Sequence, residues 1–302
     1  MSSIAYVTDE QMMEYHRLCG NREMNFWRLS PKTEFTDFKP GDLLFFYART
    51  PQSRKRSFVG YAHFRSASVL TLKKMWERYE TKNGYDNIEQ MKRAIESSAR
   101  DHRVPAKMSC LYLDGAIFFR SPIDPRDAGI RLSNSLESFT YIDQGNPGAT
   151  VRILKLAEEI GVNDFWSASL NEQCEAQFGE DMLDYQMAEI AARVAPMMQS
   201  KSAAARADHI MRAYTEAHSE LRMISGSSDA YTYRNDTLTI ALPFVYSARS
   251  RNALFQQLMG RFLSYRMELK REGIVMEHVQ IEVVTEQKDP EVETWIKELK
   301  QL

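Results

Sequence analysis

The sequence predicts an α+β protein in which a small β-barrel with helical insertions is followed by a helix-rich α/β domain. Short runs rich in aromatic residues and bounded by Pro, Gly and Ser gather between residues 43 and 119, as in paired strands with buried faces. Beyond residue 149, apolar residues recur mostly at helical spacing. A chain of 302 residues with 43% apolar content also favours two domains. We therefore expect domains at residues 1–142 and 150–302, on either side of the turn-rich DQGNPG.

The first half contains several strand-like runs and three helix-like ones. Strands are predicted at 43–48, 57–64 and 66–72, and a strand pair at 111–119 with Asp114 and Gly115 as its turn. Helices are predicted at 8–19, capped by Thr8 or Asp9, and at 73–84 and 87–101. This mixture predicts a compact barrel whose mouth is covered or reshaped by the helical insert.

The second half follows the order helices, strands, long helix, strand, helix, which is typical of an α/β domain. It opens with ATVRILKLAEEIG and VNDFWSASL and then becomes strongly helical, with helices predicted at 179–198, interrupted at Pro196, and at 202–221. Strands are expected at 221–225, 230–234, 237–246 and 278–286. Ser250 is expected to cap a long amphipathic helix at 251–271, and Asp289 with Pro290 to start the last helix.

Several protein classes lack support in the sequence. No apolar stretch approaches the roughly 18 residues of a membrane helix, and the first residues lack a signal-peptide pattern, so we expect a soluble, cytoplasmic protein without membrane contact. Cys19, Cys110 and Cys174 are odd in number and widely spaced, which favours neither a disulfide framework nor a zinc site. Motifs for nucleotide hydrolysis, dinucleotide binding and serine hydrolysis are absent.

Charge is distributed unevenly along the chain, whose net value is −2. Residues 1–142 hold 22 Lys+Arg against 17 Asp+Glu, whereas the remainder holds 17 against 24. Binding to phosphates favours a basic surface because counterions are released. Any nucleic-acid footprint is therefore expected mainly on the first half.

One stretch of motifs carries a family resemblance. NFWRLSP, FKPGDLLFFYA, RSFVGYAHF and IFFRSPID follow one another between residues 25 and 124, and their order is similar to that of the PUA-like superfamily, particularly its EVE and ASCH branches. The resemblance covers roughly residues 20–142. It implies a small barrel with a pocket in which a base, often a modified one, lies against aromatic side chains, where stacking contributes about 1–3 kcal/mol per base.

Carried over position by position, the resemblance nominates residues for two roles. The base pocket would be formed by aromatic walls and a polar contact from Ser30, the walls being Trp27, Phe46, Tyr47 and Tyr61. Phosphates, which position a strand without reading its sequence, would be held by Arg49, Arg54, Lys55 and Arg56. Core packing remains the alternative for each aromatic residue, and DNA is expected in preference to RNA.

The second half has a topological resemblance to a degenerate nuclease fold of the PD-(D/E)XK type. Such enzymes hold Mg²⁺ with carboxylates and place a lysine nearby to activate water. Asp236, Glu216, Glu286 and Lys288 are the candidate catalytic residues, although the strand at 237–246 lacks the acid-x-lysine signature. No other cofactor is expected, because His209 and His218 lack the spacing of a zinc-binding helix.

Three hypotheses about function remain open at this point. In the first, the protein binds nucleic acid and recognises a modified base, in modification-dependent restriction or phage defence. In the second, it is also a Mg²⁺-dependent endonuclease. In the third, it is a non-enzymatic assembly component whose C-terminal domain forms a homo-oligomer or binds a partner protein, with the helix that begins after Ser250 as the contact.

Overall fold

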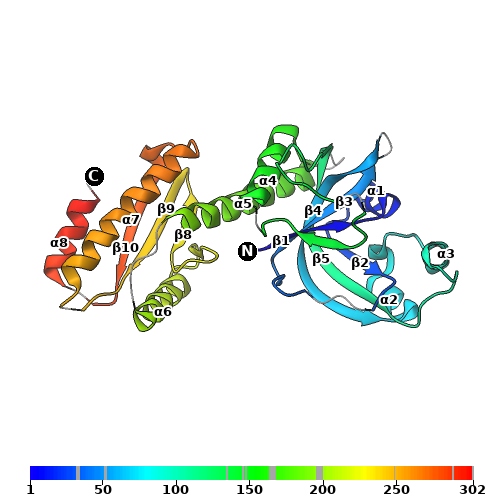
Figure 1. Ribbon diagram of the computed structural model, residues 1–302, viewed down its shortest axis with the longest axis horizontal. Coiled ribbons are helices and arrows are strands. Elements are labelled where there is room, and N and C mark those ends of the chain that lie inside the picture. The colour runs from blue at the N-terminus through cyan, green and yellow to red at the C-terminus, as the bar shows by residue number, and fades with distance from the viewer. Residues whose placement is uncertain are drawn as a thin grey trace. The chain divides into compact units, whose positions relative to one another are not determined.

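The computed structural model divides into two compact units, Met1–Leu183 and Asp184–Leu302 (Figure 1). It describes residues 1–31, 35–50, 53–133, 135–144, 146, 148–162, 168–194, 200–247, 249–287 and 289–300. The division comes later than the sequence predicted, because helix α4 (Ala149–Ile160) is bonded to the first unit. Thr150 of α4 shares a buried hydrogen bond with Ser3, and Gly161 accepts one from the amide of Arg120 at 3.0 Å.

The first unit is built on a six-stranded sheet in the order β2-β5-β4-β3-β1-β6. Its strands are β1 (Ser3–Val7), β2 (Met24–Arg28), β3 (Leu43–Thr50), β4 (Ser53–Leu70), β5 (Met108–Ile123) and β6 (Phe139–Tyr141). Only β1 and β3 run parallel. The sheet curls, since rings of β1 and β2, four places apart, lie 4.8 Å from each other at Tyr6 and Phe26. In the part of the chain that the structure describes, however, edge strands β2 and β6 are not paired, so the predicted closed barrel is not found.

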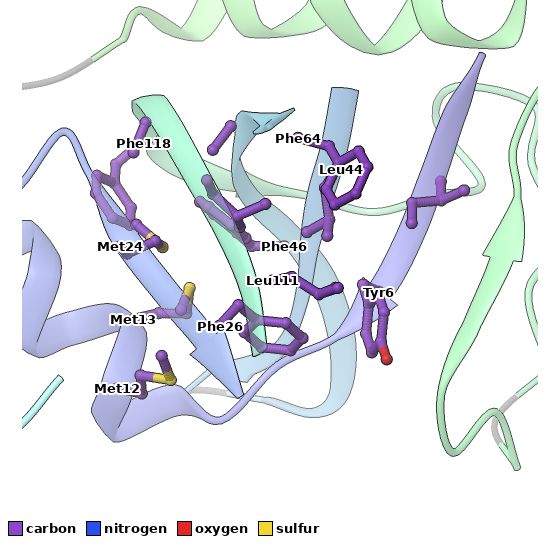
Figure 2. Close-up of a cluster of buried hydrophobic side chains, with 14 of the residues drawn as sticks. Tyr6, Met12, Met13, Met24, Phe26, Leu44, Phe46, Phe64, Leu111 and Phe118 are labelled. Carbon is purple, nitrogen blue, oxygen red and sulfur yellow. The ribbon is translucent and has the colours of Figure 1, made fainter. Parts of the chain in front are cut away.

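The concave side of this sheet holds the main hydrophobic core (Figure 2). β3 lies in the middle of the sheet and all of its residues from Leu43 to Ala48 are buried, which explains why this run is apolar without alternation. Gly60 of β4 provides close backbone approach, because a Cβ there would collide with the carbonyl oxygen of Ile117 in β5. The strand pair predicted at 111–119 is instead one continuous strand, β5. Gly115 has φ +58° and makes an irregularity in the β4–β5 register without reversing the chain.

Three helical segments cover the first unit besides α4 and the start of α5 (Ala168–Arg193). They are α1 (Glu10–Leu18), α2 (Leu72–Tyr79) with the short η1 (Glu80–Asn83), and α3 (Ile88–Ser98). Asp9 caps α1, as predicted, by accepting a 3.0 Å hydrogen bond from the Met12 amide. The insert formed by α2, η1 and α3 packs on the convex side of the sheet around Met75, Met91 and Met108.

The second unit is a four-stranded sheet in the order β10-β9-β8-β7 with helices around it. Along the chain come α6 (Lys201–Ala217), β7 (Arg222–Met223), β8 (Ala230–Arg234), β9 (Thr237–Phe244), α7 (Arg251–Arg271), η2 (Met276–His278), β10 (Val279–Thr285) and α8 (Pro290–Leu299). β9 and β10 are parallel and the other pairs antiparallel. Ala241 packs with α6, whereas Phe244, which points the other way, contacts Phe255 of α7. The α/β prediction for this region is therefore confirmed in its element order.

The predicted apolar face of α7 is used inside its own unit. Leu258, Phe262, Tyr265 and Leu269 are all buried in the second unit. A partner contact through α7, as in the third hypothesis, would therefore use other residues of this helix, of which Leu263 and Met267 are exposed. Among the described helices, none is long and apolar enough to cross a membrane.

Candidate nucleic-acid interface

Arg28, at the end of β2, connects three parts of the first unit. Its guanidinium donates to the carbonyl oxygen of Val7 at 3.1 Å and to that of Glu137 at 2.6 Å, and it lies 4.9 Å above the ring of Tyr6. Val7 ends β1, and Glu137 lies just before β6. This side chain of β2 thus reaches the ends of β1 and β6, with which β2 shares no ladder, and the sequence motifs did not nominate it.

A second cationic pair stands at the end of the β3–β4 hairpin. Arg49 and Arg56 are directly opposite each other in the register, where like charges repel. Arg49 is exposed, and Arg56 donates to the carbonyl oxygen of Leu136 at 2.6 Å. Since Arg28 bonds the adjacent Glu137, the guanidinium groups of Arg28 and Arg56 converge on one segment. We call Arg28, Arg49 and Arg56 the arginine cluster.

The other two predicted phosphate contacts differ from the arginine cluster. Lys55 is exposed and has Asp124 as an electrostatic neighbour. A hydrogen bond from Arg126 is the main reason that the pKa of Asp124 falls to about 2, and the charge of Lys55 adds to it. Lys55 is therefore partly compensated. The side chain of Arg54 lies outside the described residues.

Trp27 and Ser30 lie at the same end of β2 as Arg28. The indole of Trp27 is partly buried, donates to the carbonyl oxygen of Asn83 at 3.2 Å and lies 6.4 Å from the ring of Tyr85. Ser30 is exposed, and its carbonyl oxygen accepts a hydrogen bond from the amide of Ser109. Of the predicted pocket residues, these two retain exposed atoms beside the arginine cluster.

The other predicted pocket residues belong to the core. Phe46 and Tyr61 are completely buried, and Tyr61 donates its hydroxyl to Asp181 at 2.8 Å (Figure 2 shows Phe46). Tyr47 is 4% exposed, and burial raises the pKa of its hydroxyl while nearby Arg56 opposes that rise. Central strands have both faces covered, so none of these rings presents a face on which a base can stack. Core packing, the alternative to a pocket, therefore holds for all three.

Buried polar groups under Trp27 were missed by the sequence motifs. Asn25 donates to the side-chain oxygen of Asn83 at 2.8 Å, and Asn83 donates to the Glu80 carbonyl oxygen at the same distance. His16, on α1, is also fully buried, and burial lowers its pKa to about 4. The bond between Asn25 and Asn83 joins the insert to β2, and the bond from Trp27 to the same Asn83 holds the indole beside it.

A second polar network holds α5 to the sheet. His63 of β4 contacts the carboxylate of Asp181 at 2.8 Å, and Gln177 donates to the carbonyl oxygen of Gly115 at 2.8 Å. Tyr61 and His63 contact different oxygens of the same carboxylate. The GYAH stretch therefore carries a docking function for α5, which no local sequence signal indicates because Asp181 follows His63 by 118 residues.

The candidate catalytic residues of the second unit do not meet. Asp236 precedes β9 and Glu286 follows β10, and these two strands are parallel and in register along their whole length. The two carboxylates therefore lie at opposite edges of the sheet, nine residues apart along the register and thus separated by roughly 30 Å. Glu286 pairs with Arg206, and Glu216 is exposed on α6 ten residues beyond that arginine. The register therefore does not bring Asp236 and Glu286 to one Mg²⁺ site.

Asp236 has a local explanation. It follows Asn235 in the β8–β9 hairpin, and the two have φ values of +59° and +48°, as in a tight hairpin turn. Lys288 lies outside the described residues. Within the described part of the chain, no group of three His, Cys, Asp or Glu side chains is placed to hold a metal ion, so the donors do not fit the nuclease's Mg²⁺.

Comparison with known proteins gives structural neighbours only. No protein-family model and no curated protein matches the sequence. Similar solved structures include the ASCH protein of Zymomonas mobilis, which is 14% identical with a TM-score of 0.36 over 51% of this chain and 94% of that chain. A variant of that protein is 13% identical with a TM-score of 0.37, covering 52% and 99%. A Pseudomonas syringae protein is 9% identical with a TM-score of 0.28, covering 51% and 99%.

Proposed function

We propose that the first unit binds a single strand of nucleic acid across the end of β2, with the arginine cluster on the phosphates and Trp27 against a base. The observation that carries the proposal is the gathering of Arg28, Arg49 and Arg56 from three strands. Like charges directly opposite each other are unfavourable in an isolated sheet. A phosphate bound between them removes that repulsion.

The chemistry of arginine suits this role. A guanidinium has five N–H donors, and the described hydrogen bonds to carbonyl oxygens use one donor of Arg56 and two of Arg28. These bonds hold the side chains in place before a ligand arrives, so less conformational entropy is lost on binding. Arg28 and Arg56 are therefore preorganised for phosphate, which contributes affinity and little sequence specificity.

The identity of the base forms the finer part of the proposal. The order of the motifs around Trp27 and Ser30 is similar to that of PUA-like domains, which supports recognition of an extruded, modified base. On this proposal the ligand is modified DNA, and the biological setting is restriction or phage defence. We assign no cleavage role to the second unit, since Asp236 and Glu286 lie at opposite edges of its sheet.

The test is fluorescence anisotropy with labelled single strands of DNA and RNA, with and without a methylated base. Arg49→Gln should weaken binding to every strand and lower the slope of log affinity against log salt by about 0.7, the value for one phosphate contact to a single strand. Arg234→Gln, an exposed residue at the end of β8, is the control and should change neither quantity. Trp27→Phe should reduce the preference for the modified base and leave the salt slope unchanged.

Two results would overturn the proposal. One is failure of the wild-type chain to retain any DNA or RNA at low salt, where phosphate contacts are strongest. The other is binding that Arg49→Gln and Arg234→Gln weaken equally, which would indicate diffuse attraction with no site.

A further inference from the structure

We propose that the base of the helical insert is a second phosphate-binding surface that extends the interface beyond the arginine cluster. The insert comprises residues 71–107, between β4 and β5. We define its base as five cationic residues, namely Lys73, Lys74, Arg100, Arg103 and Lys107. This inference rests on the proposed function and deepens it, because two separate surfaces require a strand long enough to reach both.

Charge within the insert is concentrated at its two ends. The insert holds nine Lys+Arg and six Asp+Glu. Its middle, residues 77–96, has four cationic and five acidic residues, whereas the two ends together have five cationic residues and Asp101. Charge that serves solubility alone is expected to be distributed evenly. Most of the positive excess would then lie in the middle part, which is the longer one.

Strand pairing brings these two ends together. β4 and β5 are antiparallel, and Leu70 opposite Met108 is the final pair of their register. Lys73 and Lys74 follow Leu70 in the first turn of α2, and Lys107 immediately precedes Met108. The ends of the insert, separated by more than thirty residues in sequence, thus flank one end of the strand pair.

The cationic side chains of the insert base face solvent. Its apolar side chains, among them Met75, Met91 and Ile95, are buried against the sheet, and all five residues of the base are exposed. Lys73 lies 3.7 Å from Glu77, an exposed pair of a kind that contributes little to stability. The first turn of α2 has no acidic residue, and lysines there oppose the helix dipole. Their position is thus unfavourable for the helix and becomes favourable beside a polyanion.

The insert base is continuous with the proposed interface. Ser109, two residues after Lys107, pairs with Arg28 of β2 and donates its amide to the carbonyl oxygen of Ser30. Ser30 and Arg28 therefore lie between the insert base and the β3–β4 hairpin. A strand bound at the arginine cluster reaches the lysines by continuing past the end of β2.

The experiment compares two triple variants with the same change of charge. The first combines Lys73→Gln, Lys74→Gln and Lys107→Gln. The matched control combines Lys92→Gln, Lys297→Gln and Lys300→Gln, whose residues are also exposed and lie in the middle of α3 and at the end of α8. The probe is a fluorescein-labelled oligothymidylate of about 20 nucleotides, above the ~4–16 nucleotides that small binding domains cover.

The insert-base variant should bind about tenfold more weakly at low salt, with a salt slope lower by about 2, since each lost phosphate contact removes about 0.7 for a single strand. The control should match the wild type. A third variant, in which the three lysines become arginine, should keep the wild-type slope, which separates loss of charge from loss of folding. An insert-base variant that equals the control while Arg49→Gln weakens binding would overturn this inference alone. A wild-type chain that binds nothing would overturn it together with the proposed function.

Discussion

The two units differ in whether chemically suitable side chains meet at one place. In the first, curling of the sheet brings Arg28 of edge strand β2 to Val7 and Glu137, and Arg56 of β4 bonds the adjacent Leu136, so that charges from two strands gather at one segment. In the second, the parallel register of β9 and β10 holds Asp236 and Glu286 at opposite edges. The difference teaches that strand direction and register, more than residue type, determine whether a set of suitable side chains becomes a site.

The net charge of the first unit also depends on which segments fold together. The basic excess of residues 1–142 is offset inside the first unit, because residues 143–183 add eight acidic residues and two cationic ones. The whole first unit therefore holds 24 Lys+Arg and 25 Asp+Glu. Its proposed affinity for phosphate consequently depends on local clusters and not on the total charge of the unit.

The largest expected effect distinguishes core from pocket in the first unit. Phe46→Ala should lower the free energy of unfolding by about 3–5 kcal/mol, because it removes a fully buried ring from the centre of the sheet. Tyr233→Ala, which truncates an aromatic ring that is 54% exposed in the second unit, should cost less than about 0.5 kcal/mol. Urea denaturation measures both. If Phe46→Ala lowered the free energy of unfolding only slightly, the core assignment would be wrong and the ring would be a candidate wall of the base pocket.

The next effect is a difference in acid sensitivity between the units. Burial lowers the pKa of His16 to about 4 from the ordinary 6.5, so the unfolded chain takes up a proton at a higher pH than the folded one. Stability of the first unit should therefore be complete above pH 6.5 and fall as pH drops towards 4, by about 3 kcal/mol at most. The histidines of the second unit, His209, His218 and His278, are exposed and lack the burial that acts on His16.

Hydrogen exchange followed by mass spectrometry can read this difference peptide by peptide. Protection in the first unit should decrease between pH 6.5 and 4 after correction for the intrinsic exchange rate. His16→Gln should flatten that profile, whereas His102→Gln, at an exposed position, should not. An unchanged profile in His16→Gln would show that another group titrates.

The smallest expected effect concerns Asp236. Because its φ is +59°, replacement by glycine should stabilise the second unit by about 0.5–1 kcal/mol, and Asp236→Ala should destabilise it by a similar amount. Thermal melting with and without Mg²⁺ measures this, and neither variant should alter the response to Mg²⁺. A Mg²⁺-dependent stabilisation that Asp236→Gly abolishes would restore a metal role for this carboxylate.

Local signals in the sequence predicted most elements. Asp9 and Asp289 cap α1 and α8 as expected, and the aromatic runs became β3 and β4. Short strands β1 and β6 escaped prediction because five or three residues show no clear periodicity. The Asp114–Gly115 turn was wrong, since the long-range ladder to β4 continues on both sides of it.

The site was harder to predict because it depends on contacts between residues that are far apart in the sequence. Trp27, Ser30, Arg49 and Arg56 were nominated by their motifs, but the motifs could not tell a central strand from a pocket wall at Phe46 or Tyr61. Arg28 was missed because its partner Glu137 follows 109 residues later and contributes a backbone oxygen, which leaves no mark on the sequence.

The most direct test of the central claim is photochemical crosslinking of a bound single strand to the full chain, with the attached peptides identified by mass spectrometry. We predict crosslinks in the segment that contains Trp27 and Ser30 and in the β3–β4 hairpin. An excess of unlabelled strand should abolish them. Crosslinks confined to residues 184–302 would contradict the claim.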